Sequence, residues 1–105
     1  MELDIEVLRM ICKLENIEIT MHAAKRLEQR GIKINDIINC VLHGEIIEQY
    51  PTDYPYPSCL ILGMAVNNKF LHTVIGSDLS QLWIVTAYYP DTAKWSADFK
   101  VRREN

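Results

Sequence analysis

The first 44 residues place apolar side chains at the three- and four-residue spacing of amphipathic helices. In residues 1–16 this spacing predicts a first helix through Leu3, Val7, Met10, Ile11 and Leu14. A second helix of about ten residues is predicted between Thr20, a good N-cap, and Gly31, a glycine suited to the position after a helix end. A third is predicted from Ile34 to its end at Gly44.

Beyond Gly44 the pattern changes to that of extended strands. Apolar or alternating runs predict four strands, and a loop with three prolines separates the first from the second. The strands are expected at residues 45–50, 58–66, 69–76 and 81–89. Helices followed by consecutive strands indicate an α+β domain, with two to three N-terminal helices packed on one face of a four-stranded, mainly antiparallel sheet.

The composition, 49% hydrophobic and 24% charged, predicts one globular domain over residues 1–105. The N-terminal MELDIEV is acidic where a secretory signal is basic, and no apolar run approaches a membrane span, so a cytoplasmic protein is expected. Cys12, Cys40 and Cys59 are odd in number and far apart, which favours buried reduced thiols over disulfides or a zinc site. No motif predicts a metal or a cofactor.

The net charge of −3 does not indicate a general nucleic-acid binder, but the cations are unevenly distributed. Four of them lie in residues 19–33 against a single glutamate, and four more lie in the tail, residues 92–105. If the fold brings these two basic segments together, they form a local anion site. If it does not, they are solvated surface.

The second predicted helix lines up His22, Arg26 and Arg30 within about 80° of its circumference, beside its buried edge. A phosphate at the start of this helix would meet free backbone N–H groups, the histidine and the first arginine. The alternative is that the three residues simply cover the edge of an amphipathic helix.

His72 interrupts an apolar strand. It is a stronger candidate for a catalytic residue if polar side chains of the next strand lie on the same face of the sheet. Strict alternation would place Thr86 and Tyr88 on the same face as Leu82 and Ile84 of the last strand. His72 shares a face with Thr86 and Tyr88 only if the pairing register has an even index sum, which sequence does not fix.

Two further groups have both a functional and a structural interpretation. The loop after the first strand has tyrosines interleaved with prolines, at Tyr50, Tyr54 and Tyr56. These rings form an aromatic platform that binds a base or a partner's proline segment, or they hold the loop against the sheet. The tail cations are either solvated or in contact with phosphate. They are Lys94, Lys100, Arg102 and Arg103.

Several separated blocks, in order over residues 17–103, resemble the family of domain of unknown function 4258, leaving only the first helix outside. The family block with a histidine, two arginines and a glycine matches His22, Arg26, Arg30 and Gly31, and the family's strand histidine matches His72. A block of Thr, Ala and Tyr matches Thr86–Tyr88. Lys33 departs from the helix-capping serine or threonine usual in this family.

That family more distantly resembles the RelE-like toxins, small ribonucleases of toxin–antitoxin pairs with a RelE/barnase-like fold. The resemblance implies a zinc-finger or helix-turn-helix antitoxin as the partner. We therefore expect a metal-independent RNA endonuclease in which one of His22 and His72 is the base and the other is the acid. Arg26 would clamp the phosphate, and Tyr88 would donate or orient a proton. RNA would also contact Arg30, Thr86, Lys94, Arg102 and Arg103.

A second hypothesis has a different physical basis. The acidic total charge favours a non-catalytic module, or an inactive toxin relative, that pairs with a partner protein through apolar and aromatic surface. Histidines that meet in one cleft would favour the enzyme, and histidines on opposite faces would favour the module. The sequence leaves a homodimer open.

Overall fold

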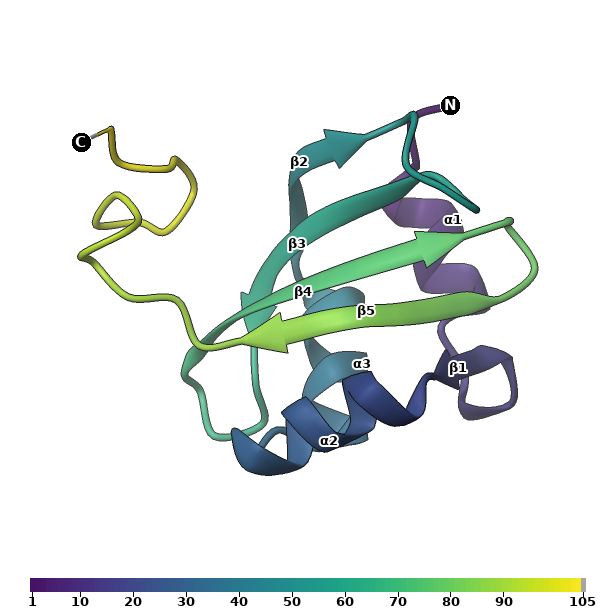
Figure 1. Ribbon diagram of the computed structural model, residues 1–105, viewed down its shortest axis with the longest axis horizontal. Coiled ribbons are helices and arrows are strands. Elements are labelled where there is room, and N and C mark those ends of the chain that lie inside the picture. Colours follow the sequence, from purple (N-terminus) through teal and green to yellow (C-terminus); the bar gives the residue numbers. More distant parts are fainter. Residues whose placement is uncertain (105) are drawn as a thin grey trace.

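The computed structural model describes residues 1–104, which form helices followed by strands (Figure 1). The helices are α1 (Ile5–Ile11), the 3₁₀ turn η1 (Leu14–Asn16), α2 (Met21–Gln29) and α3 (Ile34–His43). The strands are β1 (Ile17–Ile19), β2 (Glu45–Tyr50), β3 (Ser58–Met64), β4 (Phe70–Ser77) and β5 (Leu82–Tyr88). The predicted α+β class and each predicted helix and strand are therefore confirmed.

The sheet of the described chain has five strands in the order β1-β5-β4-β3-β2, so the prediction of four strands is wrong by one. The four long strands pair antiparallel as expected, and β1 adds a parallel edge beside β5, with Ile17 opposite Leu82. Because β1 has only three residues, it is too short for an alternating pattern to be recognised.

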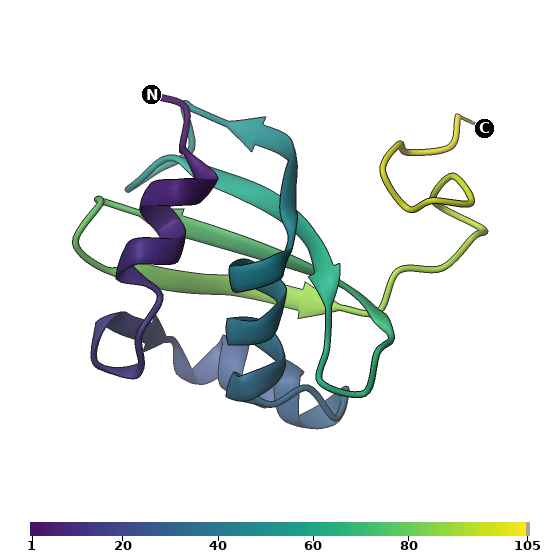
Figure 2. The same cartoon turned by 180° about the vertical axis from the view of Figure 1, so that it is seen from behind.

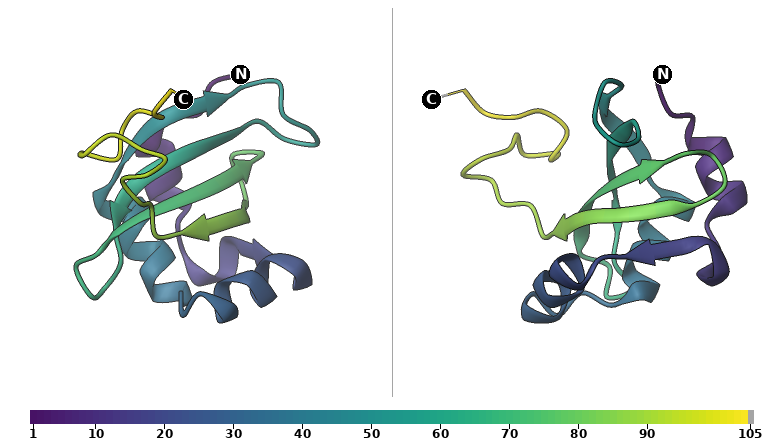
Figure 3. Two further views of the ribbon diagram at one scale, coloured as in Figure 1. Left: turned by 60° about the vertical axis from the view of Figure 1, so that its left-hand side comes forward. Right: turned by 45° about the vertical axis from the view of Figure 1, so that its right-hand side comes forward.

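Helices α1 and α3 cover one face of the sheet, α2 lies along its β5 side, and the C-terminal tail, residues 89–104, lies over the other face (Figures 2 and 3). The core lies between α1, α3 and the inward residues of β3, β4 and β5. It is built from aliphatic side chains such as Leu8, Ile37, Ile61 and Ile75, all completely buried. We call the two sides of the sheet the helix face and the tail face.

The ends of α2 and the start of α3 follow from local chemistry. The Thr20 hydroxyl accepts a hydrogen bond from the Ala23 N–H at 3.1 Å, and Gly31 ends α2 with a φ of +68°. At the start of α3, Asp36 replaces the missing side-chain cap of Lys33 by accepting a hydrogen bond from its backbone N–H at 2.8 Å.

A β-bulge corrects the predicted alternation along β5. Val74 pairs with Thr86 and Ile75 pairs with Ile84, which leaves Val85 as an extra residue. Leu82 and Ile84 therefore pack on the helix face, whereas Thr86 and Tyr88 point to the tail face.

The three cysteines are buried free thiols, as the sequence predicted. Burial raises the pKa of Cys40 to about 11 and that of Cys59 to about 12. Both therefore stay protonated at neutral pH and act as small core side chains.

Candidate functional site

His72 lies on the tail face, is completely buried, and uses both of its ring nitrogens. It pairs with Tyr88 across the sheet, so the register has the even index sum that brings the two onto one face. Its Nδ1 lies 3.2 Å from the Tyr88 hydroxyl, and its Nε2 lies 2.9 Å from the carbonyl oxygen of Phe99. The Trp95 ring closes the site edge-on at 4.4 Å.

These two hydrogen bonds assign the proton on His72. A carbonyl oxygen only accepts, so Nε2 carries the hydrogen and donates it to Phe99. In the neutral ring Nδ1 is then an acceptor, and the Tyr88 hydroxyl donates to it. The oxygen of Tyr88 keeps its lone pairs for a ligand.

The protonation states agree with this arrangement. Burial lowers the pKa of His72, and this effect outweighs the Phe99 carbonyl and the nearby Glu48 carboxylate, which favour the protonated ring. Burial also raises the pKa of Tyr88. At neutral pH the pair is therefore a neutral imidazole and a neutral phenol.

An ionic cluster borders this pair on the same face. Arg102 makes an ion pair with Glu48 at 3.0 Å, and Tyr50 donates its hydroxyl hydrogen to the same carboxylate. Burial alone would raise the pKa of Glu48, but the hydrogen bonds from Arg102 and Tyr50 leave it below its usual value. The Arg102 guanidinium lies 4.6 Å from the centre of the Trp95 ring and so helps to hold the tail over His72.

Tyr88 also borders an open cleft of about 370 Å³ between the tail and the end of α2. Positive charge reaches this cleft from Arg30, at the end of α2, and from Lys94, in the tail. Asp91 also borders it, but one oxygen of its carboxylate is engaged by the backbone N–H groups of Ala93 and Lys94. The basic segments of α2 and the tail thus meet at this cleft, which is the condition that the sequence set for a local anion site. The other residues lining the cleft are Tyr89, Pro90 and Trp95.

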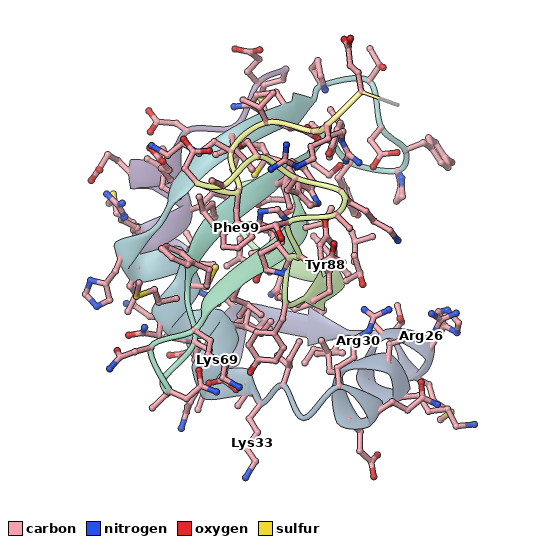
Figure 4. The ribbon with its side chains drawn as sticks, turned by 90° about the vertical axis from the view of Figure 1, so that its left-hand side faces the viewer. Arg26, Arg30, Lys33, Lys69, Tyr88 and Phe99 are labelled. Carbon is pink, nitrogen blue, oxygen red and sulfur yellow. The ribbon has the colours of Figure 1, made fainter. Side chains whose placement is uncertain are left out.

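The three residues of the predicted α2 stripe, His22, Arg26 and Arg30, differ in their contacts. Arg30 donates to the Thr86 hydroxyl at 3.1 Å and to the Ala87 carbonyl at 2.8 Å, which joins α2 to the edge of β5. His22 and Arg26 are exposed, whereas the ring of His72 contacts Tyr88 of β5 and the tail. Figure 4 shows Arg26 and Arg30 on the side of α2 facing the tail, with Lys33 directed away.

The tail cations divide in the same way. Lys94 lines the cleft, whereas Lys100 pairs with Glu45 at 2.8 Å and Arg102 pairs with Glu48. Arg103 donates to the backbone carbonyls of Thr92 and Trp95 at 2.6 and 2.7 Å. The last three cations therefore fasten the tail to the sheet or to itself.

Sequence reasoning missed Glu48, Trp95 and Phe99 as parts of the site. Trp95 had a usable signal, because a tryptophan in a charged tail must dock somewhere to be buried. Glu48 had none, since a glutamate in an edge strand is usually solvated. Phe99 contributes through its backbone carbonyl, which no side-chain pattern reveals.

Among residues 1–104 no three His, Cys, Asp or Glu side chains converge on a point where they would hold a metal ion. Within the same span, every helix is too short or too polar to cross a membrane.

A family model described as Domain of unknown function (DUF4258) matches residues 19–89. This segment contains α2, α3 and the strands from β2 to β5, with His72, Tyr88 and Arg30. Neither a curated protein nor a solved structure gives a significant match to the chain.

Proposed function

Since the chain belongs to the DUF4258 family, whose description assigns no activity, its function must be inferred from the site, and we propose that it is a metal-independent RNA endonuclease. It would act as the toxin of a type II toxin–antitoxin pair, with a RelE-like fold. The observation that carries this proposal is the hydrogen bond from Tyr88 to His72 at the edge of a cleft lined by Arg30 and Lys94.

The pair supplies a route for the proton of the attacking group. A ribose 2′-hydroxyl in the cleft gives its proton to the Tyr88 oxygen while the phenol passes its own proton to Nδ1 of His72. The 2′-oxygen then attacks the adjacent phosphorus. The resulting imidazolium is stabilised by the Phe99 carbonyl and by the negative charge of Glu48.

The two cations take the remaining roles. Arg30 stabilises the additional negative charge on the phosphoryl oxygens, and Thr86 keeps its guanidinium at the cleft. Lys94 donates a proton to the departing 5′-oxygen. The products are a 2′,3′-cyclic phosphate and a free 5′-hydroxyl, and proton exchange with solvent returns His72 and Lys94 to their starting states.

This assignment changes the roles given to α2 from sequence. His22 and Arg26 become contacts for flanking phosphates, because both are exposed on α2 while the hydrogen bonds of His72 go to Tyr88 and Phe99. The cytoplasmic location and a zinc-finger or helix-turn-helix antitoxin stay predictions that follow from the toxin hypothesis.

The test is a DNA strand with a single ribonucleotide, incubated with purified protein in a chelator. The proposal predicts cleavage only after the ribonucleotide, with a 2′,3′-cyclic phosphate on the 5′ fragment. An all-DNA strand is the matched control. Intact chimeric strand and intact cellular RNA, with and without ribosomes, would contradict the proposal if the protein is folded.

The complete burial of His72 beneath the tail favours one rival function. A non-catalytic module or inactive toxin relative would keep this cluster only to hold the tail in place. Under that hypothesis, expression of the chain leaves growth and RNA intact, whereas the endonuclease arrests growth. A pull-down with the neighbouring gene product does not separate the two, since both require a partner.

A further inference from the structure

We propose that a pocket at the far end of the tail face, formed by Tyr54, Tyr56 and Trp83, binds a nucleobase of single-stranded RNA. It would hold a nucleotide upstream or downstream of the one cleaved. This inference rests on the proposed function, because it takes the strand in the cleft to be RNA.

The pocket has a volume of about 320 Å³ and is walled by aromatic rings. Tyr56 and Trp83 stack with ring centres 4.5 Å apart and planes inclined by 21°. Tyr54 is 91% exposed, an unusual state for a large aromatic side chain that contributes nothing to the core. Exposed aromatic rings beside a phosphate site are the usual platform for stacking a base without sequence preference.

The pocket and the cleft lie on the same face of the sheet. Trp83 pairs with Gly76, and Tyr88 pairs with His72. Gly76 and His72 are four residues apart on β4, which places them on one face about 13 Å apart along the strand. The two sites are therefore within reach of one short segment of RNA.

The α2 helix connects the same two sites from the side. Thr20, its N-cap, lines the pocket, and Arg30, its C-cap, lines the cleft. Between them His22, Arg26 and Arg30 recur every four residues, about 6 Å apart along the axis. This rise is close to the step between neighbouring phosphates of an RNA strand, and His22 and Arg26 form no ion pair within residues 1–104.

These cations favour RNA over a proline-rich peptide as the occupant. A peptide would use the aromatic rings but leave the stripe of α2 unpaired. A nucleotide strand uses both, because its bases stack on the rings while its phosphates follow the helix.

The test measures binding of a fluorescent hexanucleotide with 2′-fluoro riboses, which lacks the 2′-hydroxyl and cannot be cleaved by this route. We expect Trp83→Leu to raise the Kd at least about fivefold and Trp83→Phe to restore most of the affinity. Phe70→Leu is the matched control, since Phe70 is a 43% exposed aromatic on the same face beyond His72, and it should leave the Kd unchanged.

A second variant tests the stripe without touching an aromatic ring. Arg26→Gln should reduce the slope of log affinity against log salt by about 0.7, the value for one single-strand phosphate contact. Lys25→Gln, on another side of the same helix, should leave the slope unchanged. A strand without bases should bind the wild type as weakly as the normal strand binds Trp83→Leu.

Equal binding of the strands with and without bases would overturn the inference, as would displacement of the strand from Trp83 by a proline-rich peptide. If the protein cleaves RNA but Trp83→Leu leaves the Kd unchanged, the base-binding pocket is wrong and the endonuclease proposal stands. If binding depends on Trp83 but no ribose-containing strand is cleaved, the pocket stands and the endonuclease proposal is wrong.

Discussion

The helix face of the sheet packs aliphatic side chains against α1 and α3, whereas the tail face places a buried histidine, a half-buried tyrosine and a partly exposed ion pair beside the irregular tail. Hydrophobic transfer explains the first arrangement without further assumptions. The second costs free energy unless each polar group finds a partner. On the tail face His72, Glu48 and Arg102 all have partners.

We infer from this contrast that the tail face carries the function. A chain that needed only stability would cover both faces with apolar groups, because a buried polar group such as His72 costs free energy unless its hydrogen bonds are made. The tail face instead keeps titratable side chains and places them beside an open cleft. Variants of the two faces should therefore differ in what they lose.

The largest effect on stability is expected on the helix face. Ile61→Ala removes a completely buried side chain from the core and should lower the free energy of unfolding by about 2–5 kcal/mol, measured in urea. Cleavage per folded molecule should stay at the wild-type level. A loss of activity in the folded fraction would contradict the assignment of stability to the helix face and of activity to the tail face.

A smaller loss is expected at the cleft. Arg30→Gln removes a charged hydrogen-bond donor, so the rate of RNA cleavage should fall about 10- to 100-fold, equivalent to about 1.5–3 kcal/mol. Single-turnover kinetics would measure this, with Lys25→Gln as the control on the same helix. Equal rates for the two variants would exclude Arg30 from phosphate stabilisation.

Acidification should reveal the buried histidine. The folded pKa of His72 lies below its ordinary value of 6.5, so between the two pKa values the unfolded chain binds the additional proton. The free energy of unfolding should therefore fall as the pH drops below 6.5. Urea titrations of the wild type and His72→Gln should differ in this pH slope, and parallel slopes would contradict the assignment. Cleavage should weaken over the same range.

The smallest effect is expected where the tail meets solvent. Lys100 and Glu45 form an exposed ion pair at 2.8 Å, and Lys100→Ala should lower the midpoint of thermal unfolding only slightly. Salt should abolish the difference from the wild type. A larger decrease would mean that the tail contributes to the core as well as to the site.

Local signals predicted the helices well. Thr20 and Gly31 fix the ends of α2 through a cap and a positive φ, both of which depend on residues close in sequence. The fifth strand was missed because β1 is paired through β5, more than 60 residues away, and its three residues carry no period of their own.

Only part of the site could be predicted from the sequence, and its assembly could not. His72 and Tyr88 were identified because a polar residue in an apolar strand is conspicuous, yet their pairing depends on a register that sequence leaves open. The bulge at Val85 reversed the predicted faces of β5, because one extra residue shifts every later side chain to the other side. His22 was grouped with His72 from the stripe on α2, which fixes positions on a helix but not the distance to a strand.

The most direct test compares Tyr88→Phe with Tyr89→Phe on the single-ribonucleotide strand. Both residues line the cleft, but Tyr88 has its hydroxyl on Nδ1 of His72, and Tyr89 packs against the core of the helix face. We predict that Tyr88→Phe slows cleavage about 10²- to 10⁴-fold, as expected for loss of a proton-transfer group, while Tyr89→Phe cleaves at close to the wild-type rate. Equal rates for the two folded variants would contradict the Tyr88–His72 proton route.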